Sequence, residues 1–218
     1  MDLTQSFRRF LPSEVVQRFE IREVRNAAGV LASIAPDEWQ EIVEVLSDIQ
    51  LRPDDILGAG GNKSLLAERI DSAFRQKGWR EGRVDTSIKL TVTVSSWPTG
   101  GRANVQATEV NNRGYKVDNL KGRVALDVEW NAKDGNLDRD IGAYRAMYDA
   151  GVIDAGVIIT RTQDDMRQLA LSLDPSTSKF STTTTTNLEK LQPRLTRGDG
   201  GGCPILAVAI SSKCYTPH

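Results

Sequence analysis

Histidine is almost missing from this sequence of 218 residues, which has it only at the last position, His218. One imidazole at a chain end argues against a Ser-His-Asp triad, a Cys-His pair, a histidine-ligated nuclease centre and a phosphohistidine intermediate. Hydrolysis on this chain would therefore depend on carboxylates, lysines, hydroxyls or metal-bound water.

Cysteines and long apolar runs are also scarce. The two cysteines, Cys203 and Cys214, lack the spacing of a zinc site, which predicts a reducing compartment and no structural metal. No apolar run approaches the length of a membrane span, so we expect a cytoplasmic protein with no membrane partner. The formal net charge of −1 is not that of a general nucleic-acid-binding protein. Basic residues are nevertheless in excess over 69–89 and 111–123, which favours an anionic ligand on one face.

The spacing of apolar residues predicts helices and strands in alternation. Helical periodicity covers 36–50, 62–79 and 137–151, and the second of these helices has Asn62 or Ser64 as its N-cap. Strands are expected over 86–96, 124–131, 153–161 and 203–212. We interpret 52–61 as a glycine-rich linker and 97–118 as a hairpin or loop region.

The order strand, helix, strand after residue 124 implies a parallel crossover. We therefore predict an α/β fold, with a central mixed β-sheet flanked by helices. No internal repeat is visible, and we expect a single domain across residues 1–218.

Two acidic residues share one face of the strand that begins at Val124. Val124, Leu126, Val128 and Trp130 would point one way, and Asp127 and Glu129 the other. Asp118 comes shortly before them, and a hairpin can bring it beside them. Such hard oxygen ligands suit Mg²⁺, which can activate a bound water and offset charge on a phosphoryl oxygen.

A second interpretation of these acids needs no metal. They would be exposed on the solvent face of an edge strand, paired with Lys116, Lys121 or Arg123. Composition and spacing alone slightly favour this interpretation, whereas the bulky Trp130 on the opposite face favours a firmly held strand.

The segment from Asp118 to Trp130 resembles the active-site hairpin of the BglII/BstYI group of type II restriction endonucleases, in the PD-(D/E)xK nuclease superfamily. Residues 36–49, 62–81, 153–161 and 204–210 resemble further segments of that group in the same order. The resemblance covers about residues 25–210, which would form the nuclease core of a restriction endonuclease-like domain.

The resemblance implies roles for the acidic residues. Asp118, Asp127 and the backbone carbonyl of Val128 would bind Mg²⁺, with Mn²⁺ as a substitute, and Asp118, Asp127 and Glu129 would be catalytic. The motif usually has Glu where this chain has Asp127, and lysine where it has Glu129. Glu129 would then act as a general base or as a second metal ligand, because an ionised carboxylate cannot donate a hydrogen bond.

The resemblance also implies the partners: a homodimer acting on a palindromic double-stranded DNA site, often with a GATC core, and a cognate DNA methyltransferase as genetic partner. Candidate DNA contacts come from the segment after the acidic strand and from the Thr-rich segment 176–187 with its neighbours. They are Asn131, Lys133, Asn136, Arg139, Lys179, Ser181, Thr182, Thr183, Arg194 and Arg197.

Three alternatives remain open from sequence. The Thr-rich segment is equally well interpreted as a mobile surface loop. The chain could be another PD-(D/E)xK nuclease, for repair or structure-specific cleavage, without a palindromic site. It could also be a DNA-binding module that retains the fold with a degenerate site.

Overall fold

Helices and strands alternate around one mixed β-sheet in this computed structural model, which describes residues 1–58, 64–95, 103–114, 116–182 and 184–216. The helices are α1 (Phe7–Phe10), α2 (Ser13–Arg18), α3 (Ala27–Ile34), α4 (Pro36–Asp48), α5 (Pro53–Leu57), α6 (Leu65–Gln76), α7 (Gly135–Asp149), α8 (Asp164–Leu173) and α9 (Leu188–Arg197), with a 3₁₀ turn at Ser212–Cys214. The strands are β1 (Phe19–Val24), β2 (Arg80–Arg83), β3 (Thr86–Val94), β4 (Asn104–Asn112), β5 (Lys116–Lys121), β6 (Val124–Val128), β7 (Ala155–Arg161) and β8 (Ile205–Ile210).

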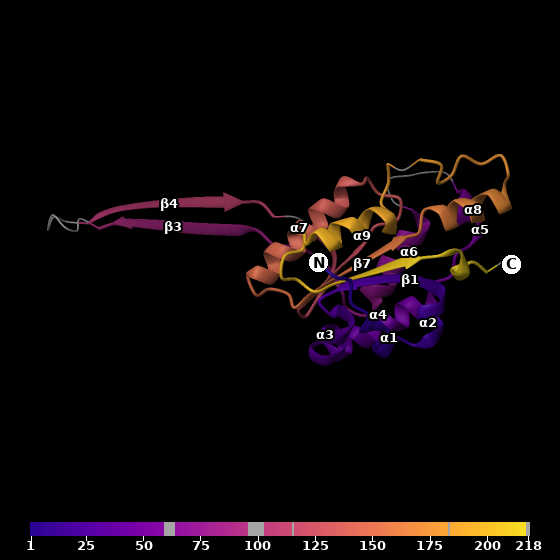
Figure 1. Cartoon of the computed structure of the whole chain (residues 1–218), viewed down its shortest axis with the longest axis horizontal. Coiled ribbons are helices and arrows are strands. Elements are labelled where there is room, and N and C mark those ends of the chain that lie inside the picture. Colours follow the sequence, from indigo (N-terminus) through magenta and orange to yellow (C-terminus); the bar gives the residue numbers. More distant parts are fainter. Residues whose placement is uncertain (59–63, 96–102, 115, 183, 217–218) are drawn as a thin grey trace. The chain divides into compact units, whose positions relative to one another are not determined.

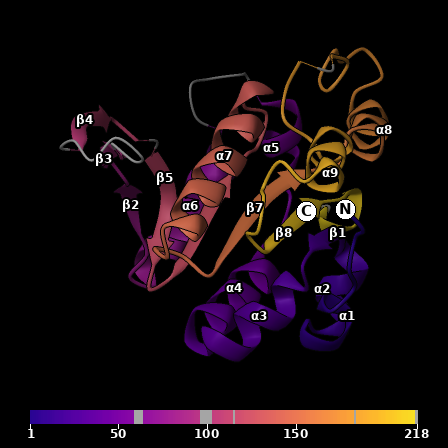
Figure 2. The ribbon, with the colours of Figure 1, turned by 60° about the vertical axis from the view of Figure 1, so that its left-hand side comes forward.

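The six-stranded sheet has the order β1-β8-β7-β6-β5-β2. Strands β6, β7 and β8 run parallel, while β1 is antiparallel to β8 and β5 is antiparallel to β6. In Figure 2, β5 and β2 lie toward one side of the sheet and β1 toward the other. The predicted fold class is confirmed: an α/β structure with a mixed central sheet flanked by helices.

Helices cover both faces of the sheet because the central strands are apolar on both faces. Every residue of β6, β7 and β8 is buried. On one face, Leu126 and Val128 join a core with residues of α3, α4 and α6. On the other face, α7 packs against β7, and α9 packs against β1 and β8. Figure 1 shows α1–α4 on one side of the strands and α7 and α9 on the other.

Two predicted helices form where the periodicity placed them. Helix α4 begins with Pro36 at its first position and buries Trp39 and Leu46. Helix α6 begins after Ser64, whose hydroxyl oxygen accepts a hydrogen bond from the Ala67 backbone N–H at 3.1 Å. Asn62, the alternative N-cap, lies outside the described residues.

The interpretation of 52–61 as a linker is wrong over its first half, which forms the short helix α5. Pro53 at its first position favours helix formation, and the Asp55 carboxylate accepts from the Arg52 backbone N–H at 2.9 Å. The same carboxylate pairs with Arg69 of α6 at 2.7 Å. This ion pair holds α5 against α6, although the glycines that follow in the sequence had favoured a linker.

The internal contacts divide the chain into two compact units, Met1–Gly82 with Val117–His218, and Arg83–Lys116. The second unit contains the antiparallel pair β3–β4, with Ile88 opposite Val110 and Leu90 opposite Thr108. The predicted strand at 86–96 forms as β3, and the region 97–118, interpreted as a hairpin or loop, supplies its partner β4; residues 96–102 and 115 lie outside the described residues. Alternate residues of β3 are large, apolar and exposed, and none of the described residues of this unit is buried.

Two positions in α3 offer a matched test of the core. Leu31 is 1% exposed and Ile34 is 56% exposed. We expect Leu31→Ala to lower the free energy of unfolding by about 2–5 kcal/mol, because it removes buried methyl groups and leaves a cavity. We expect Ile34→Ala to change it by no more than about 0.5 kcal/mol. Urea denaturation of both variants checks the placement of α3, and equal losses would contradict it.

Candidate active site

The hairpin of β5 and β6 brings the first two acidic residues together. The two strands pair with Asn119 opposite Leu126, which places Asp118 next to Asp127. The backbone N–H of Asp118 donates to Asp127 Oδ1 at 2.9 Å. Asp118 is exposed at the edge of this pair, whereas Asp127 is only 1% exposed.

Helix α7 covers the Asp127 carboxylate. The Tyr144 hydroxyl donates to Asp127 Oδ2 at 2.7 Å and lies 2.8 Å from the Val157 carbonyl oxygen. The Tyr144 ring can lie against β7 because residue 156 is glycine: a Cβ atom there would meet the ring at 2.2 Å. Gly156 therefore leaves room for the Tyr144 ring, and Tyr144 holds Asp127 from the face of the sheet that α7 covers.

Glu129 lies just beyond the end of β6 and is 3% exposed. Asn136 Nδ2 donates to its two carboxylate oxygens at 3.3 and 3.4 Å. Arg139 of α7 lies 3.7 Å from Glu129 and 2.9 Å from Asp140, a third carboxylate, which is 1% exposed. The Glu129 backbone carbonyl accepts from the hydroxyls of Thr160 and Thr186.

Three buried carboxylates thus share one region, and their pKa values rise. Burial is the largest cause for each of Asp127, Glu129 and Asp140, because loss of water disfavours the charged form. The neighbouring acids add to the shift: the charge of Asp140 raises the pKa of Asp127, and the charge of Glu129 raises that of Asp140. The pKa of Glu129 rises to about 7.

A cleft of about 760 Å³ opens over this region. Asp118, Glu129 and Arg139 line it, together with Asp71 of α6. The cleft therefore brings together acidic residues of β5, of α6 and of the turn after β6, with Arg139 of α7 beside them.

The interpretation of these acids as exposed groups on an edge strand is wrong for Asp127 and Glu129, which are buried, whereas Asp118 is exposed. Strand β6 lies inside the sheet between β5 and β7, and it is covered on both faces. Two of the basic residues expected as partners pair elsewhere: Lys121 with Glu41 at 2.6 Å, and Arg123 with Asp154 at 2.6 Å. The alternation of apolar and acidic residues in this strand separates two buried faces.

The oxygen donors suit a hydrated Mg²⁺ ion. Among the described residues, no group of three or more His, Cys, Asp or Glu side chains is arranged to hold a metal ion. Mg²⁺ does not need such a group, since it binds through one or two carboxylates and keeps several waters. Arg139 pairs with Asp140, its charge also acts on Glu129 and Asp127, and a hydrogen bond links Asp140 with Glu129. One positive charge does not neutralise three ionised carboxylates, so an incoming cation would offset the remaining negative charge.

The residues predicted to contact DNA after β6 occupy different places. Asn131 lines the cleft and its side-chain oxygen accepts from Arg161 Nε at 2.7 Å. Lys133 is exposed and its backbone forms a bridge with Thr185. Asn136 and Arg139 line the cleft, but both contact Glu129. The structure therefore places the last two beside the acids.

The later candidates divide in the same way. Lys179 lines the cleft, and its ammonium group donates to the Gly58 carbonyl. Ser181 and Thr182 are exposed, and Thr183 lies outside the described residues. Among the described residues that line the cleft, Arg194 and Arg197 do not occur; Arg194 pairs with Asp138 at 2.7 Å, and Arg197 with Asp199 at 2.6 Å.

The Thr-rich segment is more firmly held than a mobile loop. Phe180, Thr186 and Asn187 are all buried. The Thr186 backbone N–H donates to the Ala132 carbonyl at 2.9 Å, and its hydroxyl donates to the Glu129 carbonyl at 2.8 Å. The end of this segment is therefore attached to the acidic strand.

Sequence reasoning missed three residues of the site. Asp140 and Tyr144 are four residues apart on the buried face of α7, and both interact with the acids of β6. An aspartate on the apolar stripe of a helix was the available signal, because carboxylates are rarely buried without a partner. Asp71 of α6 lines the cleft and accepts from Asn119 Nδ2 at 2.8 Å; no local pattern distinguished it.

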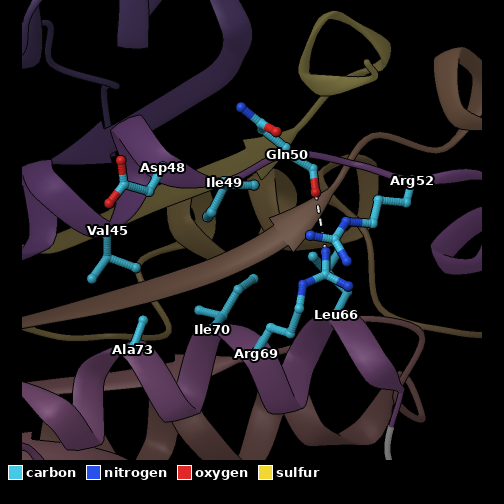
Figure 3. A pocket seen from close by; sticks show the side chains of 9 residues that line it. All are labelled: Val45, Asp48, Ile49, Gln50, Arg52, Leu66, Arg69, Ile70 and Ala73. Atoms are coloured by element: carbon cyan, nitrogen blue, oxygen red, sulfur yellow. Dashed lines mark hydrogen bonds between the residues drawn. The ribbon is translucent and has the colours of Figure 1, made fainter. Parts of the chain in front are cut away.

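A smaller cavity of about 130 Å³ lies between the end of α4 and α6 (Figure 3). Its floor is apolar, with Val45, Ile49 and Ile70 among the side chains that line it. Arg69 at its rim already donates to the Gln50 carbonyl at 3.1 Å and pairs with Asp55. Nothing in this cavity repeats the acidic group of the larger cleft.

Comparison with known proteins gives one match. The family model described as restriction endonuclease BglII/BglIII matches residues 19–210, which include every acidic residue discussed above. No curated protein matches the chain. None of the helices in the described part of the chain is long and apolar enough to cross a membrane.

Removing the Tyr144 hydroxyl tests the attachment of Asp127 to α7. We expect Tyr144→Phe to lower the free energy of unfolding by about 1 kcal/mol, since Asp127 Oδ2 and the Val157 carbonyl both lose their contact with the hydroxyl. It should also raise the pKa of the Asp127 carboxyl further, because the hydroxyl stabilises the ionised form. Carboxyl-carbon NMR measures this pKa, and the half-buried Tyr148→Phe in the same helix is the control. An unchanged Asp127 pKa would contradict the contact.

The acid cluster predicts how stability depends on pH without metal. The folded-state pKa values of Asp127, Glu129 and Asp140 lie above their unfolded values. Their contribution to the free energy of unfolding is therefore fully present only below their unfolded pKa values of about 4, and it is lost as the pH rises toward about 8. We expect the free energy of unfolding to fall by about 1–3 kcal/mol between roughly pH 5 and pH 7.5. Denaturant titrations in EDTA measure this slope.

Asp140→Asn is the matched variant for that measurement. It removes one of the mutually repelling carboxylates, so its slope between those pH values should be smaller than that of the wild type. Adding Mg²⁺ should stabilise the wild type more at the higher pH, where more carboxylates are ionised. A wild type with a flat profile would contradict the buried cluster.

Proposed function

Since this chain belongs to the restriction endonuclease BglII/BglIII family, we propose that it is a type II restriction endonuclease that hydrolyses one phosphodiester bond in each strand of a palindromic DNA site. The family match supports the nuclease. Catalysis by this chain is supported by Asp118 and Glu129, which line one cleft, and by the buried Asp127, which is hydrogen-bonded to Asp118.

The observation that carries the proposal is the shared position of the acids. Asp118 and Asp127 come from two paired strands and meet at the hydrogen bond between them, with Glu129 two residues further along. The cleft above them is lined by polar groups from four elements. A degenerate DNA-binding module would have no need to bury Asp127 and Glu129 together with Asp140, a group of carboxylates that lowers its own stability.

We assign the carboxylates of Asp118 and Asp127 and the carbonyl of Val128 as the groups that would hold Mg²⁺. The ion, when bound, would supply positive charge against the phosphate and acidify a bound water. The buried surroundings of Asp127, with the Tyr144 hydroxyl on one oxygen, restrict that carboxylate to one orientation.

Glu129 is suited to accept a proton at the reacting water. Its pKa rises to about 7, close to the pH at which a general base is most effective. Asn136 and Arg139 hold the carboxylate and compensate its charge after ionisation. The oxygen of that water would bond to phosphorus as the bond from phosphorus to the leaving sugar oxygen breaks, with the displaced proton on Glu129.

A homodimer is part of the proposal. One active site cuts one strand, so cleavage of both strands of a palindrome is met by two chains related by a two-fold axis. A GATC core is the first sequence to test. A DNA methyltransferase that modifies the same site would be the genetic partner.

The experiment is cleavage of unmethylated duplex DNA by the purified protein with Mg²⁺. We expect discrete fragments, whose ends map the site, and a loss of at least about 100-fold in rate for Asp127→Asn or with EDTA. Asp149→Asn removes a carboxylate from an exposed position at the end of α7 and should cleave as the wild type does.

Other outcomes point to the alternatives. A metal-dependent smear without fixed ends would favour a nuclease for repair or structure-specific cleavage. DNA binding without cleavage, in Mn²⁺ as well as Mg²⁺, would overturn the catalytic proposal. Full activity of Asp127→Asn would overturn the assigned active site even if the chain is a nuclease.

A further inference from the structure

Arg161, at the end of β7, is fully buried, and the hydrogen-bond partners of its side chain among the described residues are neutral. The negative charge of Glu189 favours the ionised form, but burial lowers the pKa of Arg161 to about 10. Its side chain donates to Asn131 Oδ1 at 2.7 Å, Gln163 Oε1 at 2.8 Å, Thr185 Oγ1 at 2.9 Å and the Thr162 carbonyl at 3.0 Å. Its guanidinium lies 4.6 Å from the centre of the Phe180 ring. Burying a charge in this way is unfavourable unless the fold or the function depends on it.

The partners of Arg161 belong to two segments that reach the cleft. Asn131 is in the turn after the acidic strand, while Phe180 and Thr185 are in the Thr-rich segment. Gln163 extends the connection, because its Nε2 donates to the Phe180 carbonyl at 2.7 Å. One side chain therefore holds together the two segments that flank the acids.

The contact with Arg161 determines how the Asn131 amide is oriented. A guanidinium has donors and no acceptor, so the atom of Asn131 that faces Arg161 must be its oxygen. The amide nitrogen is then left for other partners. In the described part of the chain no protein group accepts a hydrogen bond from it, and Asn131 is exposed and lines the cleft.

The backbone also favours asparagine at position 131. Its φ is +57°, in the left-handed region that asparagine, aspartate and glycine adopt most readily. This conformation explains why the residue is not a branched or bulky one, but it does not explain the side-chain contact with Arg161. Replacing Asn131 by aspartate or by glycine separates the backbone requirement from the side-chain contact. Both residues adopt a positive φ readily, but only aspartate keeps an acceptor for Arg161.

We propose that Arg161 is a positioning residue that fixes the Asn131 amide with its oxygen inward, so that Asn131 presents only N–H donors to a hydrogen-bond acceptor of the bound DNA. This inference rests on the proposed function. It excludes the paired contact with adenine, which needs the amide oxygen as well as the nitrogen. The acceptor is either the N7 of a guanine in the major groove or a phosphate oxygen.

The first arm of the test uses the protein without DNA. Asn131→Asp keeps an acceptor for Arg161 and the left-handed backbone, whereas Asn131→Gly keeps only the backbone. We expect Asn131→Asp to have the higher melting temperature of the two, and the difference to disappear when each is combined with Arg161→Met. A difference that persists without Arg161 would overturn the contact.

The second arm measures binding to the duplex site mapped by cleavage, with EDTA present so that no strand is cut. We expect Asn131→Asp and Asn131→Gly each to bind about tenfold more weakly than the wild type, because both lack the donor. The control, Arg18→Met, removes an arginine that donates to the Ser47 carbonyl far along the chain from these segments, and it should bind as the wild type does.

Modified duplexes separate a base edge from a phosphate, and both from simple repulsion by the negative charge that Asn131→Asp introduces. In one series each guanine in turn is replaced by 7-deazaguanine, which lacks the N7 acceptor. In the other, each phosphate in turn is replaced by a methylphosphonate. We expect one position at which the replacement weakens wild-type binding about tenfold but does not weaken Asn131→Gly further.

The series in which that position occurs identifies the acceptor. If every replacement weakens the wild type and Asn131→Gly equally, or if Asn131→Gly binds as tightly as the wild type, the inference is overturned while the proposed function stands. A wild type that neither binds nor cuts DNA overturns the proposed function and this inference together.

Discussion

The burial of like-charged carboxylates between β6 and α7 is the constraint on which the rest of this structure depends. Asp127, Glu129 and Asp140 have almost no exposure to water. The charge of Asp140 raises the free energy of ionising Asp127, that of Asp127 does so for Glu129, and that of Glu129 does so for Asp140. Such a group persists only if the surrounding fold is stable enough to hold it. The parallel strands β6, β7 and β8, apolar on both faces, provide that stability and leave α7 to supply Tyr144 and Arg139.

This arrangement relates stability to function. The folded state is less stable when these acids are ionised. A bound cation would restore the stability that is lost on ionisation, so the site favours positive charge. The chain has near-zero net charge, so the Mg²⁺ ion proposed above would be attracted by the local concentration of acids. Arg161 is the opposite case, a buried cation whose neutral partners belong to the segments beside the cleft. The buried acids around the end of β6 and the buried arginine at the end of the neighbouring β7 therefore lie near the same cleft.

Much of the fold followed from local pattern. Helices α4 and α6 and strands β7 and β8 form where periodicity placed them, since their apolar residues must all be buried at once. The alternation from Val124 to Trp130 correctly separated the two faces of β6. It could not show whether the acidic face met water, because an exposed edge strand and a buried strand under a helix have the same alternation. Asp127 is buried because α7, the helix that follows β6 in the chain, packs over it.

The sequence by itself determined the fold class, the order of its elements and the approach of Asp118 to Asp127, because a short hairpin leaves these two residues few alternatives. Only the tertiary structure decided which other groups join them. Asp140 and Tyr144 reach Asp127 through the crossover of α7, Asp71 reaches the cleft from α6, and Arg161 reaches Asn131 from the neighbouring strand. Asp71 and its partner Asn119, for example, are 48 positions apart in the chain. No local propensity records such contacts, since they depend on how packed layers align.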